Sequence, residues 1–415
     1  MGLRDVVQST PLVDVHTHID YKSPTARDPS QILLYHYIAT EMRSIGVPVE
    51  EALTKSEDPV RKVLPYFKLI RNTATYWCLR KILSDLYEFD EDVTPDNWEK
   101  LKSAIIERTQ DRGWSRKLME KLNVKKIFLT INPLEKVDMD FDRELYTASL
   151  RLDSLICGLS RESVKALEEV SGGDASTLDG FRECIIKRFK ALRDVSATAA
   201  VAFQSMETFR LVDEDLGREV YYKLVNGRPL HERDLEILRS IAFSTVLDVC
   251  NELKLPIQIM IGVVRDLPGA SPPDYAISFR QDGLLELCRF FGAYPEVDFH
   301  LISAYRFQSQ ELTVIAKNYP NVYLVGYWWY CFYPESIMQH ILERLQLVPM
   351  GKVCGFFSDA YVLEWIYGKA ALVRKLTQEA LEFMVSRGFY TEDLAEEIVK
   401  AIFLENPMRL YKLER

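Results

Sequence analysis

Two histidines, His16 and His18, end a short apolar run that begins at Pro11. Side chains at positions i and i+2 of an extended strand point to the same face, so both imidazoles can reach one metal ion. A second short apolar run, near the other end of the chain, ends in Asp359. Strands that end in ligand residues are typical of a (β/α)8 barrel with a metal at the carboxyl ends of its strands. The sequence therefore predicts an α/β TIM barrel with His16, His18 and Asp359 as metal ligands.

Short β-branched runs alternate with long amphipathic stretches along the chain, which favours parallel βα units. Eight runs qualify as strands, the number that a closed barrel requires. They are residues 12–17, 126–130, 145–150, 198–202, 256–261, 297–302, 322–326 and 353–357. We therefore expect residues 1–415 to form a single metal-dependent barrel domain.

The first two predicted strands are separated by a stretch that is too long to be a loop without structure of its own. We interpret residues 21–124 as a helical insertion, with helices at 31–45, 65–86 and 94–122, the last with Thr94 as N-cap. Such an insertion would cover the barrel mouth or form a subunit contact, which favours a homo-oligomer. A helical C-terminal tail is expected at 362–387 and 392–404, with a break at Gly388.

Charge and cysteine usage narrow the class of protein. The net charge is −9, and no basic cluster interrupts it, so we expect no nucleic-acid partner. The seven cysteines are scattered and odd in number, which is typical of free thiols in a reducing compartment. The start lacks an apolar signal region, and no apolar stretch is long enough for a membrane span. We expect a cytoplasmic enzyme with a small-molecule substrate and no membrane partner.

The predicted ligands supply two nitrogens and one carboxylate, which leaves positions open for water or substrate. Zinc suits this set, with manganese and iron as alternatives. Beside such a metal, Asp359 can act both as ligand and as general base. The alternative is that Asp359, like Ser358, caps the helix that follows the last strand.

The chain resembles the amidohydrolase superfamily, and most of all its uronate isomerase branch, over nearly its whole length. The motifs that carry the resemblance are His36-Tyr37, Met42-Arg43-Ser44-Ile45-Gly46-Val47, Thr130-Ile131-Asn132-Pro133, Arg151-Leu152-Asp153, Pro256-Ile257-Gln258, Ile261-Gly262 with Arg265, and Trp328-Trp329. The resemblance implies a TIM barrel with a metal site. It also makes His36, Arg151, Trp328 and Trp329 candidates for substrate binding, and Tyr37 and Arg265 candidates for catalysis beside Asp359. Tyr361, two residues after Asp359, is a further candidate for substrate binding, and His300, which ends the predicted strand run 297–299, is a further candidate for catalysis.

Each of these candidates also has a structural explanation. His300 follows an apolar run and could be a metal ligand, a proton donor or a buried histidine bonded to backbone. Tyr37 and His36 could be core residues of a helix, and Arg151 and Arg265 could form surface ion pairs instead of binding an anion. Tryptophans pack cores more often than they bind ligands.

Two positions depart from the family pattern. Met260 stands where the family carries histidine, and Tyr361 stands where it carries an arginine that could bind a substrate carboxylate. The predicted fourth strand also lacks an obvious lysine for a second metal. From these departures we predict a mononuclear hydrolase or lyase that acts on a small polar carbonyl or carboxylate compound, and weak activity on uronates. The alternatives are a uronate isomerase, in which Arg151 or Arg265 binds the carboxylate, and a non-catalytic degenerate barrel.

Overall fold

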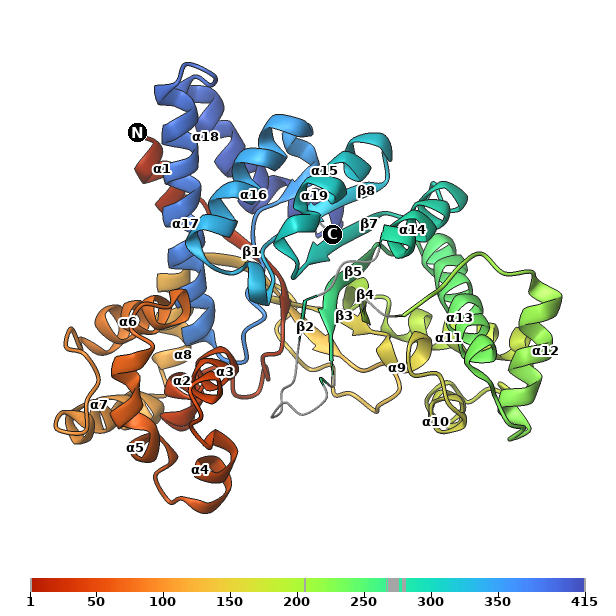
Figure 1. Ribbon diagram of the computed structural model, residues 1–415, viewed down its shortest axis with the longest axis horizontal. Helices are drawn as coiled ribbons and strands as arrows, with labels where there is room; N and C mark the ends of the chain where they lie inside the picture. The colour runs from red at the N-terminus through yellow and green to blue at the C-terminus, as the bar shows by residue number, and fades with distance from the viewer. Residues whose placement is uncertain (1, 205–206, 266, 268–275, 278–280, 414–415) are drawn as a thin grey trace.

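The computed structural model describes residues 2–204, 207–265, 267, 276–277 and 281–413. Its centre is a curled sheet in which eight parallel strands follow the order β1-β2-β3-β4-β5-β7-β8-β9 (Figure 1). These strands are β1 (Leu12–Thr17), β2 (Val124–Ile131), β3 (Tyr146–Arg151), β4 (Ser196–Gln204), β5 (Ile257–Val264), β7 (Phe299–Ser303), β8 (Val322–Val325) and β9 (Val353–Cys354). The short β6 (Ala276–Ile277) pairs antiparallel with β5. The fold is the predicted TIM barrel, and each parallel strand overlaps its predicted range.

The two ends of the sheet meet through the segment that follows β9. The N–H of His18 donates to the carbonyl of Ala360 at 2.8 Å, and the N–H of Asp359 donates to the carbonyl of His16 at 3.0 Å. These bonds place Asp359 beside the two histidines of β1, although more than three hundred residues separate them in the sequence.

β9 is shorter than the predicted strand 353–357. The N–H of Gly355 donates to the carbonyl of Ile402 at 2.8 Å. Ile402 belongs to a π-helix, η5 (Ala401–Glu405), whose wider turn brings its backbone against the sheet. The backbone of Gly355 is therefore paired outside the barrel ladder, and the strand ends before it.

The residues between β1 and β2 are helical, as expected, but the helices are shorter. They are α2 (Ser30–Leu33), α3 (His36–Ser44), α4 (Val49–Lys55), α5 (Pro59–Val63), η1 (Leu64–Leu69), α6 (Ala74–Tyr87), α7 (Trp98–Gln110) and α8 (Trp114–Leu122). The predicted helix 31–45 breaks at Leu34 and Tyr35, where Tyr35 is extended (ψ 141) and donates its hydroxyl to the carbonyl of Asp359. The predicted cap at Thr94 is wrong, because Asn97 occupies the N-cap position of α7.

The C-terminal tail is also helical, as expected. It consists of α17 (Leu363–Ser386), α18 (Glu392–Lys400), η5 and α19 (Asn406–Leu410). Gly388 breaks the tail with a φ of +74°, a conformation that glycine adopts without steric cost. α17 packs closely against α6: a Cβ on Gly368 would lie 2.9 Å from the carbonyl oxygen of Cys78.

A buried carboxylate, Glu364, ties α17 to the helical region that follows β1. It accepts hydrogen bonds from the N–H of Ala26, the hydroxyl of Tyr87 and the indole N–H of Trp114. These three partners lie before α2, in α6 and in α8, so one side chain holds three parts of the region against α17.

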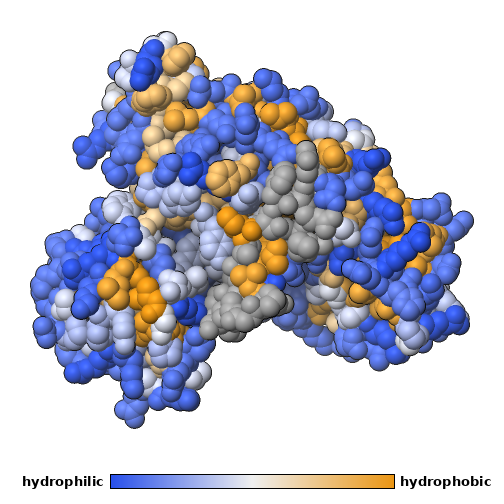
Figure 2. All heavy atoms as spheres, viewed as in Figure 1, coloured by the Kyte–Doolittle hydropathy of each residue, from blue (hydrophilic) through white to orange (hydrophobic). Residues whose placement is uncertain are grey.

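The remaining helices and short 3-10 turns lie before β1 and between the strands from β3 onward. They are α1 (Leu3–Ser9), α9 (Asp153–Ile156), α10 (Arg161–Ser171), α11 (Leu178–Leu192), α12 (Glu214–Val225), α13 (Glu232–Leu253), α14 (Gln281–Ala293), η2 (Arg306–Gln308), α15 (Ser309–Asn318), η3 (Trp329–Cys331), α16 (Pro334–Leu347) and η4 (Met350–Lys352). Most of the surface in the view of Figure 2 is hydrophilic. Within the described part of the chain, no helix combines the length and apolarity that a membrane span requires.

Candidate active site

The two histidines of β1 and the aspartate that follows β9 form a cluster with the composition of a metal site. One ligand atom from each of His16, His18 and Asp359 lies within 4.8 Å of the others. Nε2 of His18 is 3.3 Å from Oδ1 of Asp359, and Nε2 of His16 is 3.9 Å from the same oxygen. Nε2 of His16 is buried and has no hydrogen-bond partner among the described residues. A divalent cation at the centre of these three side chains would satisfy this atom, so the residues present fit a metal.

Burial keeps His16 in the protonation state that binds metals. It lowers the pKa of His16 to about 3, so the imidazole is neutral at physiological pH. Asp359 has a φ of +57°, which is rare for a residue other than glycine. The backbone bonds to His16 and from His18 described above hold it there, and such strained residues concentrate at functional sites.

The two oxygens of Asp359 face different partners. Oδ1 faces His16 and His18, whereas Oδ2 accepts a hydrogen bond from the hydroxyl of Tyr37 at 3.2 Å and lies 3.9 Å from Nε2 of His36. Burial alone would raise the pKa of Asp359, but the hydrogen bond from His18 and the surrounding positive charges outweigh it and hold that pKa well below its usual range. Asp359 is thus an anion with one oxygen toward the ligand histidines and the other toward Tyr37.

The hydroxyl of Tyr37 is bound from both sides. It donates to Asp359 and accepts from the backbone N–H of Trp329 at 3.1 Å. The rings of Tyr37 and Trp329 are stacked, with centroids 5.3 Å apart. The two bonds fix the position of the hydroxyl and, through it, the orientation of Oδ2 of Asp359.

A cavity of about 300 Å³ opens onto this cluster. It is lined by His18, His36, Arg151, Met260, Arg265, Trp328, Trp329, Asp359 and Tyr361. Eight of these nine residues are site residues that the sequence suggested, Met260 being the exception. His16 and Tyr37 do not line the cavity, but both lie against Asp359.

Two arginines line the cavity, one at the end of β3 and one directly after β5. Arg151, at the end of β3, pairs with Asp153, and its Nη1 lies 3.7 Å from the sulfur of Met260. Arg265 directly follows β5, where its backbone N–H donates to the side-chain oxygen of Gln204. The family's lost histidine is therefore replaced by a thioether that an arginine contacts.

The position that carries arginine in the family pattern holds an aromatic ring in this chain. Tyr361 is half exposed and stacks on the imidazole of His18, with centroids 5.0 Å apart and an interplanar angle of 18°. The ring also packs edge-to-face on His36. Tyr361 thus forms one wall of the cavity and supplies no cation.

The structure does not bring His300 to this cavity. It lies near the start of β7, fully buried, with its ring 4.4 Å from that of Tyr411. Burial lowers the pKa of His300 to about 3, so its imidazole is neutral at physiological pH. The position of a histidine within a strand decides whether it reaches the mouth of a barrel, and the sequence-based strand boundaries did not resolve that position.

Sequence reasoning missed two buried ionisable residues that hold the loop of Asp359. Asp14 of β1 accepts a hydrogen bond from the N–H of Ser358 at 2.9 Å. Lys369 of α17 donates to the carbonyl of Ser358 at 2.6 Å and to the hydroxyl of Tyr35 at 3.0 Å. A carboxylate within an apolar strand was a visible signal for Asp14, whereas nothing in the sequence distinguishes Lys369 from other helical lysines.

The barrel and the cluster of His16, His18 and Asp359 indicate the amidohydrolase superfamily, and comparison with known families agrees with this class. The family model described as amidohydrolase matches residues 198–413. The model described as glucuronate isomerase matches residues 3–270, well over half of the chain. The chain belongs to the glucuronate isomerase family, within the amidohydrolase superfamily that the sequence motifs indicated.

Individual relatives are distant but align end to end. The chain is 22% identical to the uronate isomerase of Thermotoga maritima over 98% of its length and 95% of the relative's. It is 23% identical to the uronate isomerase of Cutibacterium acnes, over 99% and 95%. Among solved structures it is similar to glucuronate isomerase from Caulobacter crescentus, with a TM-score of 0.89, 20% identity, and coverage of 100% of this chain and 93% of the other.

These comparisons overturn the prediction of a hydrolase or lyase. The family model over residues 3–270 and the full-length relatives are those of isomerases, the alternative reading of the sequence. The prediction gave too much weight to the changes at Met260 and Tyr361. It undervalued Arg151 and Arg265, whose convergence on one cavity becomes apparent only in three dimensions.

Proposed function

We propose that the protein is a metal-dependent aldose–ketose isomerase that acts on a hexuronate such as glucuronate or galacturonate. The observation that carries the proposal is one cavity that joins the Tyr37–Asp359 hydrogen bond to two guanidinium groups, in a chain of the glucuronate isomerase family. The first feature suits proton transfer at one end of a sugar acid, and the second suits a carboxylate at the other end.

We propose that His16, His18 and Asp359 hold a divalent metal, with zinc favoured by the two imidazole nitrogens and one carboxylate oxygen. The metal would polarise the sugar carbonyl and so acidify the neighbouring C–H group. Oδ1 of Asp359 is the oxygen that faces the two histidines, which leaves Oδ2 for other contacts.

The reaction moves a proton from C2 of the aldose to C1, while a second proton moves from O2 to O1, so nothing is gained or lost overall. We assign these transfers to Asp359 and Tyr37. Oδ2 of Asp359 accepts a proton, and the Tyr37 hydroxyl, which donates to Oδ2 and accepts from Trp329 N–H, orients that oxygen and exchanges protons with it. His36 lies 3.9 Å from the same oxygen and is placed to contact a sugar hydroxyl.

The two arginines are assigned to the substrate carboxylate. A guanidinium presents several donors in one plane and matches the two oxygens of a carboxylate, whereas neutral hexoses have no such partner. Trp328, Trp329 and Tyr361 form flat apolar walls, against which a sugar ring can pack. We assign no catalytic role to His300.

The proposal is tested by incubating metal-loaded protein with glucuronate and with galacturonate and following keturonate formation by NMR. In D2O, an isomerase that transfers a proton can also introduce deuterium from solvent at C1 of the product. Glucose serves as a matched substrate that lacks the carboxylate, and Asp359→Asn as a matched variant. Absence of any keturonate from either acid with the metal site filled would reject the proposal.

We further propose that residues 1–415 are one domain, with 21–124 as an insertion within it, since Glu364 and Gly368 join α17 to that region. We also propose a reducing cellular compartment, which the seven free cysteines support. A homo-oligomer stays a prediction.

A further inference from the structure

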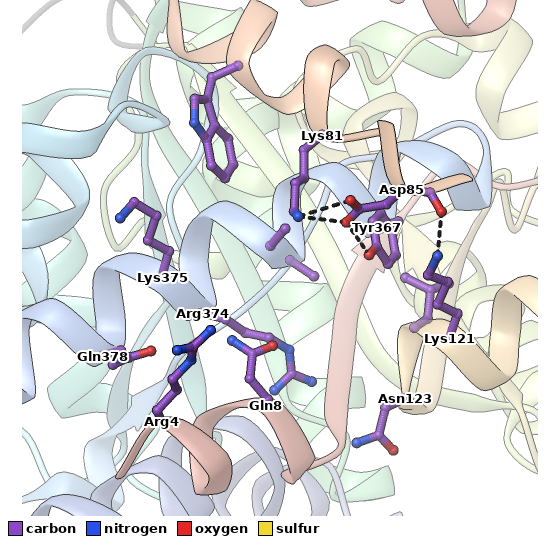
Figure 3. Close-up of a pocket in the computed structure, with 14 residues that line it drawn as sticks. Arg4, Gln8, Lys81, Asp85, Lys121, Asn123, Tyr367, Arg374, Lys375 and Gln378 are labelled. Atoms are coloured by element: carbon purple, nitrogen blue, oxygen red, sulfur yellow. Dashed lines mark hydrogen bonds and ion pairs between the residues drawn. The ribbon is translucent and has the colours of Figure 1, made fainter. Parts of the chain in front are cut away.

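A second cavity lies away from the candidate active site. It has a volume of about 650 Å³ and is bounded by α1, α6, α8 and α17 (Figure 3). None of its lining residues lines the cavity at Asp359. Its size falls in the range of sites that hold small organic molecules.

Positive charge gathers in this cavity, although the whole chain carries a net charge of −9. Five cationic side chains and one carboxylate line it, a formal excess of four positive charges: Arg4, Lys81, Lys121, Arg374 and Lys375 against Asp85. Like charges that converge on one hollow repel each other and raise the local concentration of anions. The cavity therefore favours an anionic occupant.

Two of the five cations are engaged in the structure itself. Lys81 pairs with Asp85 at 2.8 Å, and the hydroxyl of Tyr367 donates to the same carboxylate at 2.6 Å. Arg374 is buried and donates to the carbonyls of Val7 and Thr10 at the C-terminal end of α1. These two cations are held by contacts within the protein, and their charges add to the positive potential of the cavity.

The other three cations form weaker contacts within the protein or no ion pair among the described residues. Arg4 is exposed and has no ion-pair partner among the described residues. Lys121 donates to the backbone carbonyl of Asp85, and Lys375 pairs with Glu379 one turn along α17, a solvent-exposed ion pair of a kind that adds little to stability. These cations come from three different helices, so they can surround one anionic group.

The remaining lining suits a group larger than an inorganic ion. Gln8, Asn123 and Gln378 add amide groups, while Trp77 and Leu122 add apolar surface. A phosphate monoester carries nearly two negative charges and three acceptor oxygens, so it can bind cations that approach from several directions, whereas a carboxylate carries one charge in one plane. An aromatic ring beside such a group can pack against a sugar.

We propose that this cavity is a binding site for a phosphorylated, sugar-sized molecule, with Arg4, Lys121 and Lys375 binding the phosphate and Trp77 packing against the sugar. The site is separate from the one proposed for isomerisation. Its test therefore measures binding alone, without turnover.

The probe is glucose 6-phosphate, titrated at low ionic strength into the whole protein by isothermal calorimetry, with tryptophan fluorescence as a second readout. We expect saturable binding that is weakened at least tenfold in Arg4→Gln and in Lys121→Gln. The matched control is Arg116→Gln on α8, because Arg116 is well exposed, pairs with Glu120 and does not line the cavity. The fluorescence change should disappear in Trp77→Phe.

Three further ligands separate the possible sources of binding. Inorganic phosphate should bind more weakly than the ester, and unphosphorylated glucose should not bind. Citrate, a tricarboxylate, should also be weaker than the ester. The proposal would be overturned if the ester does not bind the wild type. It would also be overturned if Arg4→Gln and Lys121→Gln bind the ester as tightly as the control Arg116→Gln does, or if citrate binds as tightly as the ester.

A footprint checks the location without any variant. Amine acetylation followed by mass spectrometry should show that the ester protects Lys121 and Lys375, while the exposed Lys317 on α15 reacts equally with and without it. Protection of neither cavity lysine would contradict the assignment.

Discussion

The ammonium group of Lys369 lies 3.8 Å from the centre of the Tyr37 ring. The same group donates to the hydroxyl of Tyr35 and to the carbonyl of Ser358. Tyr37 is hydrogen-bonded to Asp359, and Ser358 precedes Asp359 in the chain. One buried cation on α17 therefore holds both the tyrosine and the loop of the proposed proton-transfer pair.

The first prediction follows from this contact. Lys369→Met removes the charge and keeps most of the volume, so we expect kcat to fall about ten- to hundredfold, the equivalent of roughly 1.5–3 kcal/mol for hydrogen bonds to a charged group. KM and metal content should change little, because Lys369 does not line the cavity. Steady-state kinetics and elemental analysis test this. A large fall in Tm with kcat unchanged would assign Lys369 to the fold alone.

The second prediction concerns the metal. His16→Ala and His18→Ala should each lose bound metal, as measured by inorganic mass spectrometry, because each removes one of three predicted ligands. His300→Asn is the matched control, since it alters a buried histidine that lies outside the cavity. Full metal occupancy in both β1 variants, or its loss in His300→Asn, would contradict the ligand assignment.

The third prediction concerns the Tyr37 hydroxyl. Tyr37→Phe removes the bond to Asp359 and leaves the N–H of Trp329 without its partner, so we expect a loss of about 1 kcal/mol in stability. Turnover should fall far more than this loss alone would produce. Tyr361→Phe is the control, because it keeps the ring that stacks on His18 and should change kcat little. Equal kcat values in the two variants would remove Tyr37 from the mechanism.

Much of the fold could be predicted from periodicity alone. The strand 12–17 matches β1 at both ends, because an apolar run with a clear start and a polar end leaves little choice of boundary. Tertiary contacts decided the rest. Gly355 pairs with Ile402, which shortens the last strand, and Tyr35 breaks a predicted helix where its hydroxyl reaches the loop of Asp359. The residues next to Gly355 and Tyr35 in the sequence do not indicate these distant partners, Ile402 and Asp359.

The candidate site shows the same division. The clustering of His16, His18 and Asp359 could be predicted because residues at the carboxyl ends of strands share one edge of a barrel. The reaction class could not be predicted, since it depends on which distant groups share a cavity. Arg151 and Arg265 stand more than a hundred residues apart in the sequence, and only the fold places both at one cavity.

The fourth prediction tests that convergence. Arg265→Met should raise the KM for glucuronate about ten- to hundredfold, because a charge-assisted bond to a carboxylate is worth roughly 1.5–3 kcal/mol. Arg151→Lys keeps a charge but loses the planar pair of donors, so a smaller rise is expected. Arg210→Met, which removes the exposed partner of Glu236, is the control. An unchanged KM in both cavity variants would place carboxylate binding elsewhere.

The last prediction concerns stability and pH, at a residue that does not line the cavity. Burial raises the pKa of Glu41, on α3, to about 6, against a hydrogen bond from Thr73 that lowers it. The unfolded chain has a pKa near 4.3, so between about pH 4.3 and 6 the folded state binds more protons than the unfolded state. Stability from this group is therefore present at low pH and is lost as pH rises through the folded pKa.

Glu41→Gln keeps the shape and removes the titration. At pH 7 the variant should be more stable than the wild type by up to about 2 kcal/mol, and the difference should vanish near pH 4, where both forms of the position are neutral. Urea unfolding at both pH values measures it, with the exposed Glu57→Gln as the control. A Glu41→Gln variant that is less stable than the wild type at pH 7 would have the wrong sign, and it would mean that the folded protein holds Glu41 as a stabilised anion.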